Sequence, residues 1–299
     1  MTFNPEPVFR EWQINSETKI TGLEWKNDKP IALLAHANGF CAGVWAPLAR
    51  LLLPHYHVIA YDFRGHGSSS KPAPPEGYHW QYLVDDLLEL SRQILADKGQ
   101  KKIALLAGNS LGGVISAAAA GEVDLFDRVV MLDPPLRPSD SMMKTLNMTP
   151  PEGPKPGVVI AKMARRRRSI WPDRETAGLA WRQKPVFKNW SDESYALYLE
   201  HGMQDRADGD VELCCPPEVE ASIFEATGSV DVFERAKQIK CPVQLVKASK
   251  GLFPIGLYQG FISLVPQGKL LVMEGGHLLP MEETEKTAEF LINADALEA

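Results

Sequence analysis

Residues 103–113 read Ile-Ala-Leu-Leu-Ala-Gly-Asn-Ser-Leu-Gly-Gly, and they predict the central element of the fold. The apolar run at 103–107 predicts a strand buried on both faces, as in a parallel sheet covered by helices. Residues 108–112 then fit the pattern G-x-S-x-G, and the small residues of 111–121 predict a helix packed closely on the sheet. A strand, a sharp turn at Ser110 and a helix form the arrangement that exposes a nucleophilic serine.

The residue types of this turn suit that chemistry. Glycines at 108 and 112 lack the Cβ atoms that would clash in so tight a turn. The Leu111 N–H would lie at a helix N-terminus, where it can stabilise an oxyanion. Without its neighbours the pattern is a weak signal, and the alternative is a tight turn with a capping serine.

Outward from the turn, apolar runs alternate with helical stretches. This alternation predicts an α/β fold with a mostly parallel central sheet flanked by helices. The other predicted buried strands are 31–35, 58–61, 129–132, 243–246 and 270–273, and the predicted helices include 45–53, 82–97 and 282–293. Residues 8–14 and 19–25 flank a polar turn and predict an antiparallel hairpin at the sheet edge.

The alternation stops after Leu132 and resumes at Val243. We therefore expect an α/β domain made of residues 1–133 and 238–299, with a mainly helical cap inserted as residues 134–237. An insertion that follows a strand end should fold over that edge of the sheet and shape a largely apolar cavity. Its candidate substrate-binding side chains are Trp171, Trp181, Phe187 and Trp190, which alternatively build only the cap's own core.

Composition narrows the class of protein. The chain has 299 residues, is 44% hydrophobic and carries a net charge of −6, which gives no reason to expect nucleic acid. The four arginines at 165–168 are the one basic run in an otherwise acidic chain, and we predict that they form a solvated helix face. No apolar run approaches the ~18 residues of a membrane span, and no signal peptide is apparent. Four cysteines without zinc-ligand spacing predict a reduced cytoplasmic protein without a metal site.

Two further motifs follow the first long strands, and a third comes late. They are His36-Ala37-Asn38-Gly39-Phe40, Asp62-Phe63-Arg64-Gly65-His66-Gly67-Ser68 and Gly275-Gly276-His277. Together with the Ser110 turn, their order and spacing resemble the α/β-hydrolase superfamily over most of the chain. The resemblance implies the α/β-hydrolase fold and an oxyanion hole made by the N–H groups of Leu111 and Asn38. Alanine stands at position 37 where the family usually has glycine.

The resemblance also places His277 as the base. A neutral imidazole there can take the serine proton and return it to the leaving group. His36 and His66 lie in the other loop motifs, where we expect them to hold the loops together.

The carboxylate that should orient the base is not in its usual place. The usual position is the loop after the next-to-last strand, but no aspartate or glutamate occurs from Cys241 through Met273. Asp133 follows the strand before the insertion, at the sheet edge where catalytic groups gather. Certain haloalkane dehalogenases are similar in placing the acid there. We therefore predict Asp133 as the acid; the alternative is that it only caps the strand end.

The expected activity is acyl transfer to water from a carboxylic ester or related small, largely apolar carbonyl substrate, as in carboxylesterases (EC 3.1.1). A C–C bond hydrolase, a lactonase or a cofactor-free haloperoxidase would use the same three residues. A non-catalytic receptor of the same fold is an alternative from another class. We expect no metal, no cofactor, no nucleic-acid or membrane partner, and a small molecule as the substrate.

Overall fold

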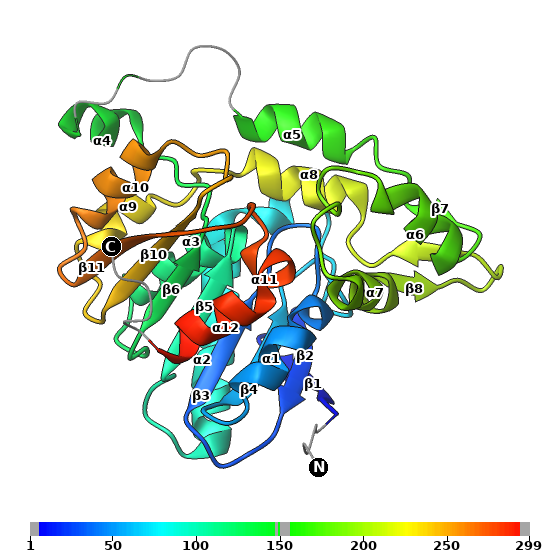
Figure 1. Cartoon of the computed structure of the whole chain (residues 1–299), viewed down its shortest axis with the longest axis horizontal. Coiled ribbons are helices and arrows are strands. Elements are labelled where there is room, and N and C mark those ends of the chain that lie inside the picture. Colours follow the sequence, from blue (N-terminus) through cyan, green and yellow to red (C-terminus); the bar gives the residue numbers. More distant parts are fainter. Residues whose placement is uncertain (1–5, 147–148, 150–155, 294–299) are drawn as a thin grey trace.

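One central sheet has the strand order β1-β2-β4-β3-β5-β6-β10-β11 (Figure 1). The computed structural model describes residues 6–146, 149 and 156–293. Strand β2 pairs with both β1 and β4 in antiparallel fashion, whereas the other neighbours are parallel. The mostly parallel sheet and its edge hairpin are therefore confirmed. The strands are β1 (Val8–Gln13), β2 (Lys19–Trp25), β3 (Ile31–Ala35), β4 (His57–Asp62), β5 (Leu105–Asn109), β6 (Val129–Leu132), β10 (Val243–Ala248) and β11 (Gly268–Met273).

Helices cover both faces of this sheet. Successive strand residues point to opposite faces, so Leu33 and Leu34 belong to two different buried cores. On one face lie α1 (Ala46–Leu52), which follows the short helix η1 (Ala42–Trp45), together with α11 (Leu279–Glu282) and α12 (Thr284–Ile292). On the other face lie α2 (Trp80–Lys98), which follows η2 (Glu76–Tyr78), with α3 (Leu111–Ala120), α9 (Val232–Ala236) and α10 (Ile255–Ile262). Among the described helices, none is both long and apolar enough to cross a membrane.

Several predicted elements differ in their limits, and two of the differences are informative. Strand β5 begins and ends two residues later than predicted, and it extends to Asn109 because Gly108 pairs with Ala35 and Asn109 with Leu132. The sheet therefore holds the backbone up to the residue before Ser110. The predicted closing helix at 282–293 is divided into α11 and α12, with Glu283 in a non-helical conformation between them (φ −132°, ψ 56°).

Residues 134–237 are called the insertion here, and the part of it that the structure describes forms helices and a small second sheet. The helices before α9 are α4 (Asp140–Thr145), α5 (Pro156–Ala164), α6 (Arg174–Arg182), α7 (Asp192–His201) and α8 (Pro217–Glu225). Strands β7 (Ile170–Trp171), β8 (Met203–Asp205) and β9 (Val211–Leu213) form a sheet in the order β7-β9-β8. This sheet was not predicted, because strands of two or three residues are too short to show alternation. Helix α9 packs against α3, so the chain rejoins the core layers before residue 237.

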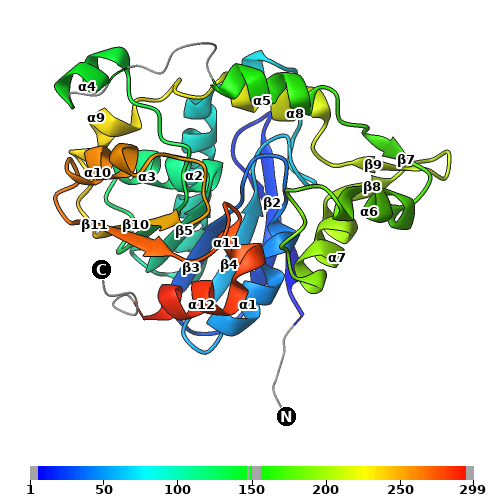
Figure 2. The same ribbon diagram turned by 45° about the horizontal axis from the view of Figure 1, so that its top comes forward.

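Helices α5 and α8 pack side by side within the insertion (Figure 2). Ion pairs join the turn after α5 to α8, because Arg165 contacts Glu218 at 2.7 Å and Glu225 at 2.6 Å. Arg167 pairs with Glu220 of the same helix. The arginine run at 165–168 was predicted to be a solvated helix face, but it lies in the turn after α5, and two of its side chains form ion pairs with α8.

Candidate active site

Ser110 occupies the sharp turn between β5 and α3. Its backbone has φ 54° and ψ −119°, one of two non-glycine residues with positive φ in the described chain. A Cβ at Gly108 would collide with the Gly112 backbone, and one at Gly112 would collide with Ala35. Close approach of backbones therefore requires both glycines of the motif. The Ser110 residue is half-buried, so solvent reaches the turn.

His277 lies on the loop between β11 and α11, and its Nε2 is 3.0 Å from Ser110 Oγ. The loop is held from two sides. The Asn109 side-chain amide donates to the His277 carbonyl at 3.0 Å. The Glu282 carboxylate accepts the N–H groups of Gly276 and Leu278, at 3.0 and 3.1 Å. The imidazole is 32% exposed, which leaves it open to a substrate.

Asp133 completes the contact chain. It follows β6 with φ 45°, and its Oδ2 lies 2.7 Å from His277 Nδ1. A carboxylate at Nδ1 favours the tautomer with the proton on that nitrogen, so Nε2 can accept from the Ser110 hydroxyl. The carboxylate is fully buried and its other oxygen, Oδ1, accepts the Ala248 N–H and the Tyr258 hydroxyl, each at 3.0 Å. The three residues that the sequence analysis nominated from separate strand ends thus lie in contact.

The loop after β10, which has no acid, provides space for Asp133, and the donors come from Ala248 at the end of β10 and Tyr258 on α10. A Cβ at Gly251 would lie 2.6 Å from Asp133 Oδ2. Glu274 points elsewhere, to Lys250 at 2.8 Å and to Ser249 at 2.6 Å. Sequence reasoning missed Tyr258, since a tyrosine 125 positions after its partner carries no local signal.

The predicted oxyanion loop, which carries Asn38, is fixed by both the core and the insertion. The Asn38 side-chain amide donates to the Glu220 carbonyl at 2.9 Å. The Gly39 N–H donates to His66 Nε2 at 2.9 Å, and its carbonyl accepts the Tyr198 hydroxyl at 3.2 Å. Leu111, the other predicted donor, is the first residue of α3. The oxyanion roles of the Asn38 and Leu111 N–H groups stay predictions.

His36 and His66 hold loops together, as expected. His36 Nδ1 donates to the Ala37 carbonyl at 2.7 Å, while its Nε2 accepts the Phe63 N–H at 3.2 Å. Both imidazoles are fully buried. Burial lowers the pKa of His36 to about 4 and that of His66 well below its ordinary value, so both are neutral near pH 7.

The four nominated aromatic side chains of the insertion pack mainly on one another. Trp171 and Trp181 meet edge to face at 5.6 Å, and Phe187 lies 5.2 Å from Trp190. All four are at least 92% buried. Phe40 of the oxyanion loop joins the cluster, 5.1 Å from Trp190. The arrangement favours the core-building alternative, and substrate contact by these rings stays a prediction.

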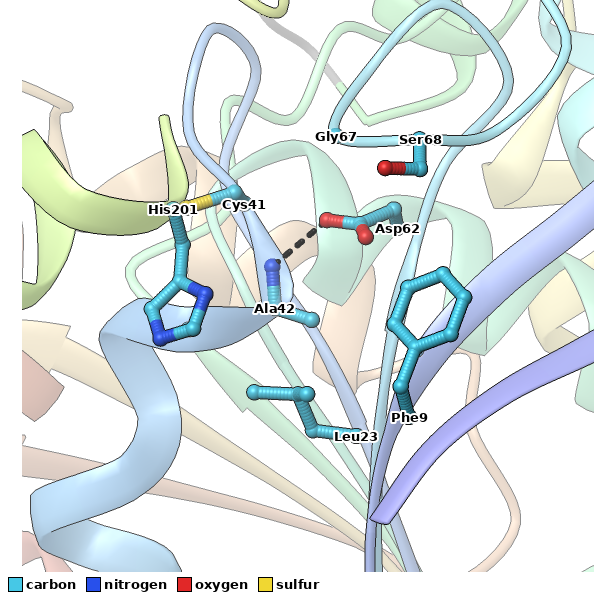
Figure 3. Close-up of a pocket in the computed structure, with 10 residues that line it drawn as sticks. Phe9, Leu23, Cys41, Ala42, Asp62, Gly67, Ser68 and His201 are labelled. Carbon is cyan, nitrogen blue, oxygen red and sulfur yellow. Dashed lines mark hydrogen bonds between the residues drawn. The ribbon is translucent and has the colours of Figure 1, made fainter. Parts of the chain in front are cut away.

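A separate small cavity lies between the start of η1 and the edge hairpin (Figure 3). Asp62 borders it, and its carboxylate accepts the Ala42 N–H at 2.7 Å and the Thr21 hydroxyl at 3.1 Å. His201 of α7 and Cys41 also line it. Burial raises the pKa of Asp62 to about 6, against the lowering effect of its hydrogen bonds and of Lys71. Both carboxylate oxygens have partners, so we assign Asp62 the structural role of tying η1 to the sheet.

Asp62 and the buried histidines should affect stability in opposite directions as the pH changes. Neutral His36 stabilises the fold above its unfolded pKa of 6.5, and this is lost as the pH falls through about 4. Asp62 binds its proton more tightly in the folded protein. Its contribution to stability is therefore fully present below pH 3.8 and is lost as the pH rises through about 6. The effects of His36 and Asp62 each amount to roughly 3 kcal/mol and offset each other, while His66, whose pKa is also lowered by burial, acts in the same direction as His36.

Asp62→Asn should therefore expose the histidine effect. We expect its free energy of unfolding, measured by urea titration, to fall more steeply between pH 6.5 and 4 than that of the wild type. Asp28→Asn, at an exposed carboxylate, is the control and should leave the slope unchanged. Equal slopes for Asp62→Asn and the wild type would contradict this assignment.

Comparison with known proteins identifies the family. The model of the alpha/beta hydrolase family matches residues 32–290, so the chain belongs to that family. Among curated relatives, 3-oxoadipate enol-lactonase 2 of Acinetobacter baylyi is 25% identical over 264 residues, or 86% of this chain and 85% of the relative. The 2-(acetamidomethylene)succinate hydrolase of Mesorhizobium japonicum is 36% identical over 109 residues, or 36% of this chain.

The match covers less than half of two other curated relatives. The chain spans 37% of the length of that succinate hydrolase. A putative carbamate hydrolase, RutD, of Agrobacterium fabrum is 29% identical over 36% of this chain, which spans 39% of that relative's length. A crystal structure of E-2-(acetamidomethylene)succinate hydrolase superposes with a TM-score of 0.76 at 23% identity, covering 97% of this chain and all of that one. At this identity the superposition shows the shared fold.

Among the described residues, no group of three histidine, cysteine or acidic side chains is placed to hold a metal ion.

Proposed function

We propose that this chain is a serine hydrolase that transfers an acyl group from a small carbonyl substrate to water. The observation that carries the proposal is the contact chain from Ser110 Oγ to His277 Nε2, at 3.0 Å, and from His277 Nδ1 to Asp133 Oδ2, at 2.7 Å. An activated nucleophile needs a base within hydrogen-bond reach and a third group that orients the base. The three residues fit these roles as nucleophile, base and acid.

The proposed reaction has two halves. Ser110 attacks the carbonyl carbon while His277 takes its proton, and the Leu111 and Asn38 N–H groups hold the oxyanion. His277 then gives the proton to the leaving group as the acyl-enzyme forms. In the second half, His277 removes a proton from water, which attacks the acyl carbon, and Ser110 leaves with that proton. Asp133 stabilises the imidazolium in each half.

A carboxylic ester is the substrate class we place first. A lactone and an amide or carbamate follow, because the names of the relatives describe an enol-lactonase and a putative carbamate hydrolase. We propose that the insertion acts as a cap that shapes the substrate pocket beside this site. Its contacts with Asn38 and Gly39 support this role, since they join it to the loop beside the nucleophile.

The test combines active-site labelling with turnover. A fluorophosphonate probe should label one residue, and mass spectrometry of the digested protein should find the label on Ser110. Chromogenic esters of graded acyl length, lactones, an amide and a β-diketone should then rank the substrate classes. A folded protein that neither labels nor turns over any of them would support the alternative of a non-catalytic small-molecule receptor.

A further inference from the structure

Asp133 is held by a tyrosine that lies far away in the sequence. Tyr258, on α10, donates its hydroxyl to Asp133 Oδ1 at 3.0 Å, beside the Ala248 N–H on the same oxygen. Both the Tyr258 and the Asp133 side chains are fully buried. A buried carboxylate is stable only when its oxygens are hydrogen-bonded, so these two donors supply what water cannot.

We infer that Tyr258 is a positioning residue of the proposed triad, whose hydroxyl fixes the Asp133 carboxylate and moderates the basicity of His277. The inference rests on the proposed function, because the tuning matters only if His277 acts as the base. Two donors on Oδ1 prevent rotation of the carboxylate and keep Oδ2 facing the imidazole. The Tyr258 hydroxyl also withdraws charge from the carboxylate, which then stabilises an imidazolium less strongly.

The effect of the Tyr258 hydroxyl on His277 can be separated from that of the other ionisable groups around the site. Burial, followed by the charge of Asp133, raises the pKa of Tyr258 far above its ordinary value, so the hydroxyl remains a donor throughout the assay range. Glu282 faces the His277 loop from α11 and accepts two of its N–H groups. Lys250 and Glu274 form an exposed pair on the adjoining loops. None of these groups contacts the Tyr258 hydroxyl.

Tyr258→Phe tests the inference, because it keeps the ring and removes the donor. Without the hydroxyl, Asp133 becomes more basic and favours protonated His277. The acidic limb of the profile of kcat/KM against pH should therefore move up by roughly half to one pH unit, the equivalent of one hydrogen bond. The downfield proton resonance of the His277 Nδ1–H, which lies against Asp133, should shift as well.

Tyr61→Phe is the matched control. Tyr61 is fully buried on β4, and its hydroxyl has no hydrogen-bond partner among the described residues. Its removal should leave both the pH profile and the Nδ1–H resonance unchanged. If folded Tyr258→Phe also leaves both unchanged, Tyr258 only fills space and the inference is overturned.

A second variant covers the case in which Tyr258→Phe does not fold. A ring-fluorinated tyrosine incorporated at position 258 is a stronger donor, so it should move the acidic limb and the resonance in the opposite direction. An unmoved resonance would overturn the inference. The Nδ1–H resonance can be measured without turnover, so it tests the role of Tyr258 independently of activity. Failure of the proposed function would instead be shown by a wild type that is inactive and is not labelled by the probe.

Discussion

Ser110→Ala should lower kcat for ester hydrolysis by a factor on the order of 10⁶, as expected when the nucleophile of a triad is removed. The loss follows from the proposed acyl-enzyme, which cannot form without the hydroxyl that contacts His277 Nε2 at 3.0 Å. The fold should persist, because serine and alanine both place a Cβ on the same positive-φ backbone. Initial rates with a chromogenic ester, together with circular dichroism, measure both outcomes.

The control for this variant lies on the helix that Ser110 precedes. Ser116 of α3 is fully buried, and its hydroxyl has no partner among the described residues, so Ser116→Ala should retain activity close to that of the wild type. Removing even one general acid–base group typically lowers the rate by more than about tenfold. If Ser110→Ala lowers activity by less than that, Ser110 is not the nucleophile.

Asp133→Asn should lower kcat by roughly 10⁴-fold, the cost typical of losing a triad acid. The geometry gives the reason. The donors from Ala248 and Tyr258 both point at Oδ1, so the amide of the variant must place its oxygen there. Its NH₂ group then faces His277 Nδ1 and favours the tautomer with the proton on Nε2. That nitrogen could no longer accept the Ser110 proton.

Asparagine should not disturb the backbone at this position, because it tolerates positive φ better than most residues. Asp127→Asn, at an exposed carboxylate just before β6, is the control and should leave the steady-state kinetics unchanged. Near-full activity of Asp133→Asn would mean that the imidazole has another acid, despite the contact of 2.7 Å.

The proposed tautomer also predicts what the pH profile of Asp133→Asn should show. The imidazolium loses its stabilising carboxylate, so the acidic limb should move to lower pH, the reverse of the change expected for Tyr258→Phe. The two variants together therefore test whether Asp133 and Tyr258 act on His277 through one hydrogen-bonded chain.

Local features of the chain could be predicted from its amino-acid sequence. The run at 103–113 determined a strand, a turn and a helix, because buried parallel strands are continuously apolar and a tight turn between backbones requires glycine. The alternation of apolar runs determined the sheet, and the absence of acids between Cys241 and Met273 directed attention to Asp133.

Contacts between distant residues depend on how the chain folds in three dimensions. The side chains of Asp133 and His277, 144 positions apart, meet because β6, β10 and β11 are neighbours in the sheet. Tyr258 reaches Asp133 from a helix that the sequence analysis did not predict. The small sheet of the insertion likewise depends on pairing between short strands. Hydropathy reflects the burial of each residue, so it can be read along the chain. A hydrogen bond between distant residues depends on where two chain segments meet, and no local sequence pattern predicts that.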